Sequence, residues 1–324
     1  MKKLIIACFT VLSANSAQAQ ETGMKLWYDR PATQWVESLP LGNGRLGAMV
    51  YGDPIHEEFQ LNEETIWGGS PYNNTNPKAK EALPQIRQLI FEGRNKEAQA
   101  LCGPNICSQT ANGMPYQTVG SLHLDFEGIS SYSNYYRELD IEKAVTTTRF
   151  TAGGVTYTRE AFTSFPDQLL IIRLTASEKG KLSFTARYST PYQENITKSI
   201  SSRKELQMDG KANDHEGIEG KVQFTALTRI ERNGGHMESV SDTLLRVRNA
   251  NSVTIYVSIG TNFINYKDIS GNARKTAQTY LKNAGKNYLK AKEAHCATYG
   301  KWFNRVSLDL GSNAHAAKPT HVRV

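Results

Sequence analysis

Residues 144–164, AVTTTRFTAGGVTYTREAFTS, hold two short runs rich in threonine, valine and aromatic residues, separated by Gly153-Gly154. Such side chains favour β-strands, and two glycines between two runs of this kind predict the tight turn of a β-hairpin. Similar runs recur roughly every ten residues from 118 to 188, with Gly, Pro or Asp between them, which is typical of an antiparallel sandwich. We therefore expect a mainly β protein built from antiparallel sheets.

Other elements follow from the same periodicities. Further strands are expected at 24–28, 46–52, 57–61, 121–126, 135–140, 168–176, 180–188, 205–208, 221–232, 244–248 and 252–260, and a second hairpin turn at Asn233-Gly234-Gly235. Apolar residues at helical spacing predict a helical insertion at 79–101 with a break at Gly93, and two helices at 273–285 and 287–303. A short segment at 305–310 and a stretch of linker composition follow them.

Gly42, Gly44 and Gly47 spell G-x-G-x-x-G, the spacing found in dinucleotide-binding turns. That interpretation needs a strand before the glycines and a helix after them. Pro40 disfavours a strand upstream, and residues 46–52 suit a strand better than a helix. We therefore expect a tight turn that feeds a strand, and no nucleotide or other cofactor.

The first 19 residues have the three regions of a bacterial secretory signal: Lys2 and Lys3, an apolar run at 4–14, and a small-residue site that ends at Ala19. The apolar run is too short to span a bilayer permanently. This predicts cleavage after Ala19 and a periplasmic or secreted protein. No later segment is long and apolar enough to suggest a membrane span.

The net charge of +7 falls to +5 once the two signal lysines are removed. The remaining basic residues are scattered among carboxylates, so we expect a solvated surface and no nucleic-acid partner. Three cysteines remain after cleavage. Cys102 and Cys107 could form a disulfide across a turn at Gly103-Pro104 in an oxidising compartment, and Cys296 is left over.

Three ordered motifs carry a family resemblance: WYDRPATQWVESLPLGNGRLGAMVYG at 27–52, QLNEETIWGGSPYNN at 60–74, and YQTVGSLHLDF at 116–126. Together with the helical linker that follows the strands, they resemble the N-terminal domain of glycoside hydrolase family 95. The resemblance implies a β-super-sandwich, a helical linker and then a helical barrel that carries catalysis. Most members of that family are α-L-fucosidases that act on terminal α-1,2-linked fucose.

The signal peptide at 1–19 follows from its own residues, and the resemblance implies a super-sandwich domain at 24–270, with the helical insertion at about 79–101, and a helical linker at 272–324. The catalytic barrel is expected after the linker, so we interpret the chain as the truncated front part of such an enzyme, and its oligosaccharide partner would bind through the missing domain. The catalytic carboxylates of the family lie in that barrel. We therefore assign no catalytic residue here, and the sequence indicates no oligomeric state.

Glycoside hydrolysis by inversion needs two facing carboxyl groups, one acid and one base. Glu57 and Glu58 are adjacent in an expected strand, so their side chains should point to opposite faces. Asn62, Glu63, Glu64 and Trp67 lie in an expected loop, where they could form a polar and aromatic surface that contacts substrate or a second domain. The alternative is a structural loop in which Asn62 or Thr65 bonds to backbone and Trp67 packs in the core.

The sequence gives little support for a metal site or for a catalytic serine. The seven histidines are dispersed without the H-x-x-x-H spacing of a zinc site, and G-x-S-x-G is absent. We therefore expect neither a metal nor a serine nucleophile. The main hypothesis is a non-catalytic N-terminal domain of a secreted α-L-fucosidase-like hydrolase. The alternative is a stand-alone sandwich that binds carbohydrate without cleaving it, which would expose a cluster of Trp and Tyr side chains.

Overall fold

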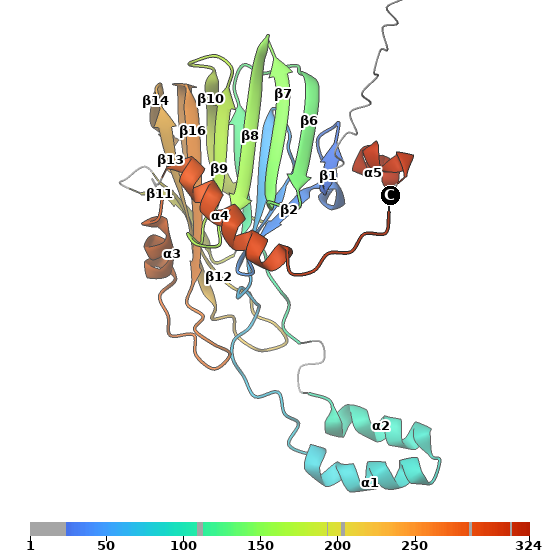
Figure 1. Cartoon of the computed structure of the whole chain (residues 1–324). Coiled ribbons are helices and arrows are strands. Elements are labelled where there is room, and N and C mark those ends of the chain that lie inside the picture. The colour runs from blue at the N-terminus through green and yellow to red at the C-terminus, as the bar shows by residue number, and fades with distance from the viewer. Residues whose placement is uncertain (1–23, 109–112, 193, 202–204, 285–286, 312) are drawn as a thin grey trace, which may run out of the picture.

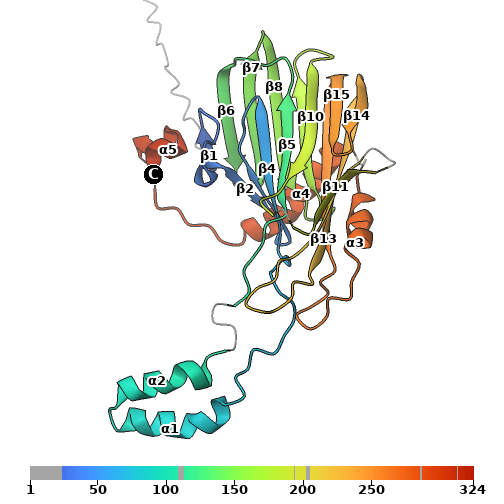
Figure 2. The same ribbon diagram turned by 180° about the vertical axis from the view of Figure 1, so that it is seen from behind.

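The computed structural model describes residues 24–108, 113–192, 194–201, 205–284, 287–311 and 313–324; the predicted signal segment 1–19 and its cleavage site lie outside them. Two antiparallel sheets pack face to face, as Figures 1 and 2 show from opposite sides. Alternate residues of each strand point into the space between the sheets. The expected mainly β sandwich with small helical parts is confirmed.

The order of the strands places sequence-distant segments side by side. The nine-stranded sheet runs β1 (Lys25–Tyr28), β6 (Ser133–Asp140), β7 (Val145–Ala152), β8 (Val155–Thr163), β9 (Leu170–Ala176), β16 (Ser252–Thr261), β13 (Gln223–Asn233), β12 (Leu206–Lys211) and β11 (Ile196–Ile200). The seven-stranded sheet runs β14 (His236–Ser241), β15 (Leu244–Ala250), β10 (Leu182–Ser189), β5 (Gly120–Phe126), β4 (His56–Glu63), β3 (Leu46–Val50) and β2 (Leu39–Gly42).

The hairpin at Gly153-Gly154 is confirmed. Ala152 pairs with Val155, which leaves the two glycines as the whole loop, and their φ angles are +55° and +82°. Positive φ at both central residues is the requirement of a type I′ turn, whose twist matches that of the flanking strands. The local sequence therefore determines the turn between β7 and β8 and the pairing of these two strands.

The prediction of a second hairpin, at Asn233-Gly234-Gly235, is wrong. The strand before it, β13, pairs with β12 and β16, whereas the strand after it, β14, pairs with β15 in the other sheet. The two glycines instead carry the chain from one sheet to the other. A Cβ at Gly235 would lie 2.1 Å from the carbonyl oxygen of Arg248, so only glycine fits this crossing.

The glycine-rich turn at 42–47 follows a strand after all, which corrects the expectation drawn from Pro40. β2 contains Pro40 and pairs with β3 at the edge of the seven-stranded sheet, where a missing N–H costs nothing. A strand and not a helix follows the glycines, so the dinucleotide interpretation fails on its second condition. Two further strands, β11 and β14, were not expected because their sequences, ITKSI and HMESVS, are largely polar and exposed.

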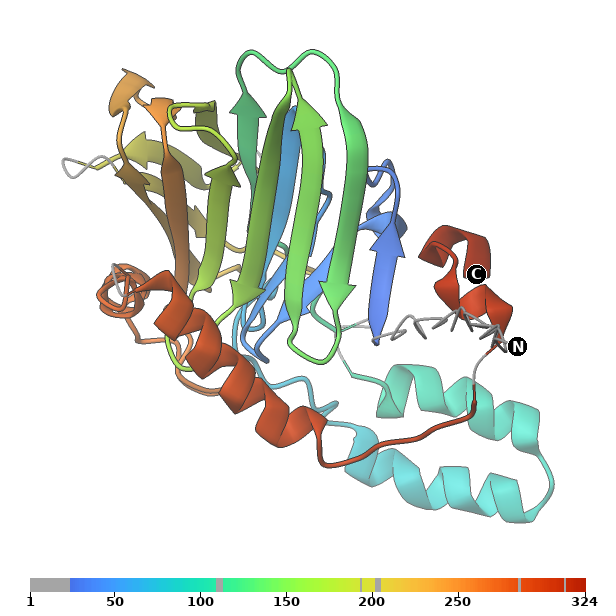
Figure 3. The ribbon, with the colours of Figure 1, turned by 45° about the horizontal axis from the view of Figure 1, so that its top comes forward.

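Three helices pack near the nine-stranded sheet or its edge. α3 (Ala273–Leu281) lies against β13 and β16, and α4 (Tyr288–Phe303) crosses the same outer face (Figures 1 and 3). α5 (Thr320–Arg323) sits beside the edge strand β1, where Thr320 Oγ1 accepts a hydrogen bond of 2.9 Å from the amide of Trp27. Two short 3-10 helices, η1 (Trp35–Glu37) and η2 (Ala314–Ala317), complete the elements of the described residues.

The helical insertion forms an arm that extends from the sandwich (Figures 1 and 2). It consists of α1 (Ala79–Phe91) and α2 (Asn95–Ile106), separated at Gly93 as expected, and it has a small core of its own around Ile86, Leu89 and Ala98. The turn expected at Gly103-Pro104 does not form, because α2 continues through it. Cys102, Cys107 and Cys296 are free thiols in this structure.

Candidate functional site

Two places on the molecule have the residue types that bind sugars: the corner after β4 and a polar cleft beside α3. The corner contains the residues expected to form a loop, but Asn62 and Glu63 belong to the end of β4. Glu63 is only 2% exposed. Its Oε2 accepts hydrogen bonds from the amide (2.8 Å) and the hydroxyl (2.6 Å) of Thr65, and its Oε1 lies 3.5 Å from Arg45 Nη1.

Burial raises the pKa of Glu63, while the hydrogen bonds from Thr65 and the charge of Arg45 act in the opposite direction. Glu64, the next residue, is exposed and its backbone carbonyl accepts a bond from the Trp67 indole. The two carboxylates therefore lie in different environments. The buried Glu63 carboxylate stabilises the turn after β4 through Thr65 and Arg45, so it is not accessible to a ligand.

Trp67 does not pack in the core, contrary to the structural alternative for this loop. It is 45% exposed, and its ring meets that of Tyr116 edge to face at 5.4 Å between centroids. Tyr116 is 40% exposed and donates from its hydroxyl to Asn62 Oδ1 and to the Glu63 carbonyl, each at 3.2 Å. Burial raises the pKa of Tyr116 to about 12, so the phenol stays protonated as a donor.

Tyr116 is the corner residue that sequence reasoning missed. It lies 49 residues after Trp67, on the far side of the helical arm, and an isolated bridge joins the two residues. The only signal for it in the sequence is its place at the start of the YQTVG stretch. The corner thus gathers Asn62, Glu64, Trp67 and Tyr116 at the surface, with Glu63 buried beneath them.

Glu57 and Glu58 point to opposite sides of β4, as expected. Glu57 is fully buried between the sheets, where its Oε2 lies 2.8 Å from Arg159 Nη1. Glu58 is partly exposed and accepts a bond of 2.6 Å from the Ser121 hydroxyl. These two carboxylates cannot converge on one ligand.

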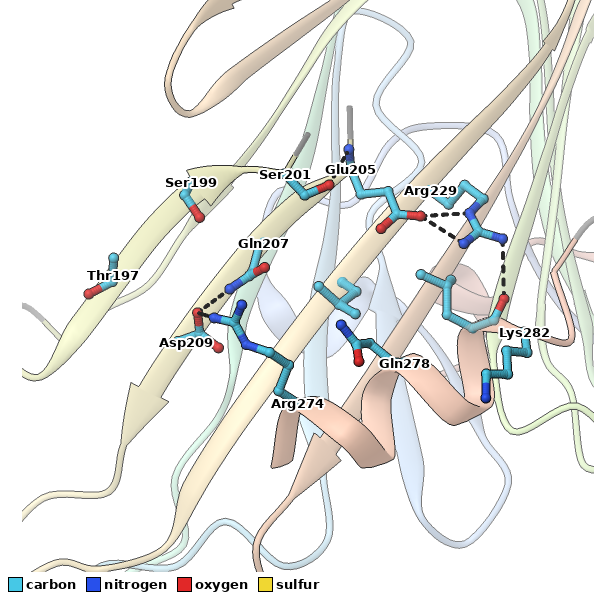
Figure 4. A pocket seen from close by; sticks show the side chains of 12 residues that line it. Thr197, Ser199, Ser201, Glu205, Gln207, Asp209, Arg229, Arg274, Gln278 and Lys282 are labelled. Carbon is cyan, nitrogen blue, oxygen red and sulfur yellow. Dashed lines mark hydrogen bonds and ion pairs between the residues drawn. The ribbon is translucent and has the colours of Figure 1, made fainter. Parts of the chain in front are cut away.

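The second place is a cleft of about 690 Å³ on the outer face of the nine-stranded sheet. Figure 4 shows Thr197, Ser199 and Ser201 along one side and Arg274, Gln278 and Lys282 of α3 along the other. The strand residues alternate, so they share one face of β11 and its continuation. The helix residues are spaced by four, so they share one face of α3.

Between these two walls, charged groups are held by mutual contacts. Glu205 Oε1 accepts from Arg229 Nε at 2.8 Å and lies 2.7 Å from Arg229 Nη2. Asp209 accepts from Gln207, from the Thr225 hydroxyl at 2.6 Å and from Arg274 Nη2 at 3.0 Å (Figure 4). Both carboxylates are therefore ion-paired and hydrogen-bonded.

This cleft does not present the acid and base of an inverting glycosidase. Glu205 lies just before β12 and Asp209 lies within it, and an inverting pair needs one carboxyl group free to act as an acid and the other free to act as a base. Each carboxylate is instead occupied by an arginine. The arrangement suits binding of polar groups better than proton transfer.

Among the residues that the structure describes, no group of three histidine, cysteine, aspartate or glutamate side chains could hold a metal ion. None of the helices that the structure describes has the length and apolar character needed to cross a bilayer.

Comparisons with known proteins show which family and which relatives this chain is similar to. The family described as "Glycosyl hydrolase family 65, N-terminal domain" matches residues 26–266. "Alpha-L-fucosidase 2" of Arabidopsis thaliana is 31% identical over 322 residues, which cover 90% of this chain and 37% of the plant protein. "Probable alpha-fucosidase A" of Aspergillus niger is 29% identical and covers 91% of this chain and 39% of its own length.

The chain therefore spans less than two fifths of the length of these curated relatives. Among solved structures, a bacterial glucoamylase complexed with acarbose aligns with 59% of this chain and 33% of its own, at 12% identity and a TM-score of 0.38. That score is too low for the likeness to bear on function.

Proposed function

The chain belongs to the family of glycosyl hydrolase family 65 N-terminal domains, and from this premise we propose that it is the non-catalytic sandwich of an α-L-fucosidase-type glycoside hydrolase related to glycoside hydrolase family 95. The observation that carries the proposal is the 31% identity to an α-L-fucosidase over 90% of this chain. The substrate class of such an enzyme is an oligosaccharide with a terminal α-L-fucosyl group.

The state of the buried and cleft carboxylates supports a non-catalytic role. Glu57 is paired with Arg159, Glu63 with Thr65 and Arg45, Glu205 with Arg229. Each of these carboxylates is thus engaged by a cation or a hydrogen-bond donor of the protein itself. Catalysis would then depend on residues of a further, helical domain.

Exposed apolar side chains at the end of α4 and in the segment after it support a role in packing against that domain. Trp302, Val306, Leu308 and Leu310 leave between 62% and 87% of their surface exposed. Residues 306–310 form no regular element, and three apolar side chains in so short a segment are costly to leave in water. We infer that the catalytic domain covers them, and that the exposed pair Trp67 and Tyr116 contacts substrate or the same domain.

An activity assay tests the proposal. The 324-residue protein is incubated with a trisaccharide that ends in α-1,2-linked L-fucose, alongside Glu63→Gln and Glu205→Gln variants. We expect no turnover from any of them. Turnover by the unaltered chain that disappears in one of these single carboxylate variants would show that this chain carries the chemistry and would refute the proposal.

We also propose that the protein is exported. The support is the basic, apolar and small-residue order of positions 1–19. Mass spectrometry of the protein expressed in a bacterial host with its natural leader should give an N-terminus at Gln20. A full-length cytoplasmic product that retains Met1 would contradict export.

A further inference from the structure

We propose that the cleft between β11, β12 and α3 binds a neutral oligosaccharide. This inference rests on the proposed function, since it supposes that the natural ligand comes from the glycans on which an α-fucosidase-type enzyme acts. The cleft contains no acid and base pair, so the site would hold a glycan without cleaving it. Some of its polar groups tie α3 to the sheet: Arg274 binds Asp209, and Arg229 donates to the carbonyl of Leu281.

The size of the cleft fits a short glycan. Its volume of about 690 Å³ lies inside the range of roughly 300–1,000 Å³ that is usual for small-molecule sites. Two rigid walls define it, because β11 is hydrogen-bonded to β12 along its length and α3 is anchored to β16. At that anchor, Ser258 Oγ donates a hydrogen bond of 2.8 Å to the carbonyl oxygen of Ala277.

Four polar side chains face the cleft without a partner in the protein. Thr197 and Ser199 from β11, and Gln278 and Lys282 from α3, line it, and none of the four side chains hydrogen-bonds to any group in the parts of the chain that the structure describes. Together they supply two hydroxyls, an amide and an ammonium group. Hydroxyl groups of a sugar could bind to both walls at once.

The balance of charges in the cleft favours a neutral ligand. The acidic residues Glu205 and Asp209 are each matched by an arginine, so the cleft carries little excess charge apart from that of Lys282. Asp209 already accepts from three groups, which holds its carboxylate in a fixed orientation. A strongly anionic or cationic ligand would have to break these pairs.

The apolar part of the lining selects against flat aromatic ligands. No aromatic side chain is among the lining residues, so a nucleobase would find nothing on which to stack. Leu227 and Leu281 also line the cleft, but each is only 2% exposed, so polar side chains supply most of the surface that a ligand would touch.

Titration of the whole 324-residue chain tests this inference. The probes are 2′-fucosyllactose and lactose, followed by saturation-transfer NMR and calorimetry. Gln278→Ala removes an unpaired donor and should weaken binding of 2′-fucosyllactose about three- to tenfold, the effect expected for one hydrogen bond. Ser199→Trp places a large side chain in the cleft from the exposed edge strand and should abolish binding.

Two controls locate the site. Gln99→Ala makes the matched change on an exposed face of α2, away from the cleft, and should leave binding unchanged. Trp67→Ala alters the aromatic corner, the rival site, and shows whether the saccharide binds there instead. Loss of binding in Trp67→Ala with full binding in Ser199→Trp would overturn the inference, as would failure of both saccharides to bind at millimolar concentration. Either result would leave the proposed domain role standing, because the fucosidase assay tests that separately.

Discussion

Arg159 on β8 reaches across the sandwich to Glu57 on β4, so an ion pair of 2.8 Å joins the nine-stranded sheet to the seven-stranded one. Both side chains are almost completely buried. The guanidinium also donates to the carbonyls of Asp53 and Pro54, and the Glu57 carboxylate accepts from the amide of Gly52 at 2.7 Å. The pair therefore fixes the turn before β4 as well as the spacing of the sheets.

Removal of one partner of this ion pair should strongly reduce the stability of the protein. Arg159→Met leaves the Glu57 carboxylate buried without its counter-charge, and we expect a loss of about 3–5 kcal/mol in the free energy of unfolding. Urea denaturation measures it. Arg94→Met, which breaks an exposed ion pair on the helical arm, should barely move the midpoint. The double variant Glu57→Leu/Arg159→Met should recover much of the loss, and a double variant no better than the single one would contradict this account.

Gly260 is the contact point between α3 and the sheet. A Cβ there would lie 2.5 Å from the amide nitrogen of Ala277 and 2.6 Å from the carbonyl of Ala273. Gly260→Ala should therefore push α3 away and cost about 1–3 kcal/mol, the range for overpacking. Gly103→Ala in α2 is the matched control, since it meets no atom within 4 Å, and its stability should be equal or higher. Equal unfolding midpoints for the two variants would disprove the close approach.

Substitutions at Gly153 and Gly154 should differ in their cost to stability according to the side chain introduced. Both positions have positive φ and open space around them, so the backbone conformation alone decides what is tolerated. Gly153→Asn should be nearly neutral, because asparagine accepts this conformation in a type I′ turn. Gly154→Val should cost about 1–2 kcal/mol, the strain of a left-handed residue with a Cβ. Thermal unfolding of both variants checks the order.

Acid should weaken the docking of α4 through His295. Burial lowers the pKa of this histidine, although hydrogen bonds to the carbonyls of Ala144 and Lys143 act against the shift. A hydrogen bond to the backbone of Thr163 also acts against the shift, and the ring stacks on Phe162 with 4.8 Å between the ring centroids. Protonation would place a charge in the buried contact between α4 and the sheet.

The sign follows from the lowered pKa. In the unfolded chain a histidine titrates near 6.5, so the stability that neutral His295 contributes is complete above that pH and is lost as the pH falls toward the lower folded-state pKa. The melting temperature should fall between pH 7.5 and 5, and less so in His295→Phe. His236→Gln, an exposed position, should keep the slope of the unaltered protein; an unchanged slope in His295→Phe would argue against the mechanism.

Local signals in the sequence predict local structure well. Gly153-Gly154 joins two strands that pair with each other, so its turn is decided within a few residues. Asn233-Gly234-Gly235 has the same composition, but the partners of its two strands lie far away in the chain. No local pattern separates a hairpin turn from a crossing between sheets, since the difference lies in which strands are already present on each side.

The candidate sites show the same limit. The opposite orientation of Glu57 and Glu58 follows from strand alternation alone. Glu63, by contrast, is buried because β4 extends to it and pairs it with Leu46, and the exposure of Trp67 depends on Tyr116 from beyond the helical arm. The polar cleft joins β11, a strand too polar to be expected, to a helix more than 70 residues later. Only the folded arrangement brings them together.

The bridge between Trp67 and Tyr116 separates the helical arm from the structure that bears it. β4 and β5 are neighbours in one sheet, and the bridged residues close the gap between them. The arm formed by α1 and α2, residues 79–106, is thus carried by a two-strand unit and has its own small core. Such a module can be shortened, exchanged or lost over evolutionary time at little expense to the sandwich, so length variation among homologues should concentrate there.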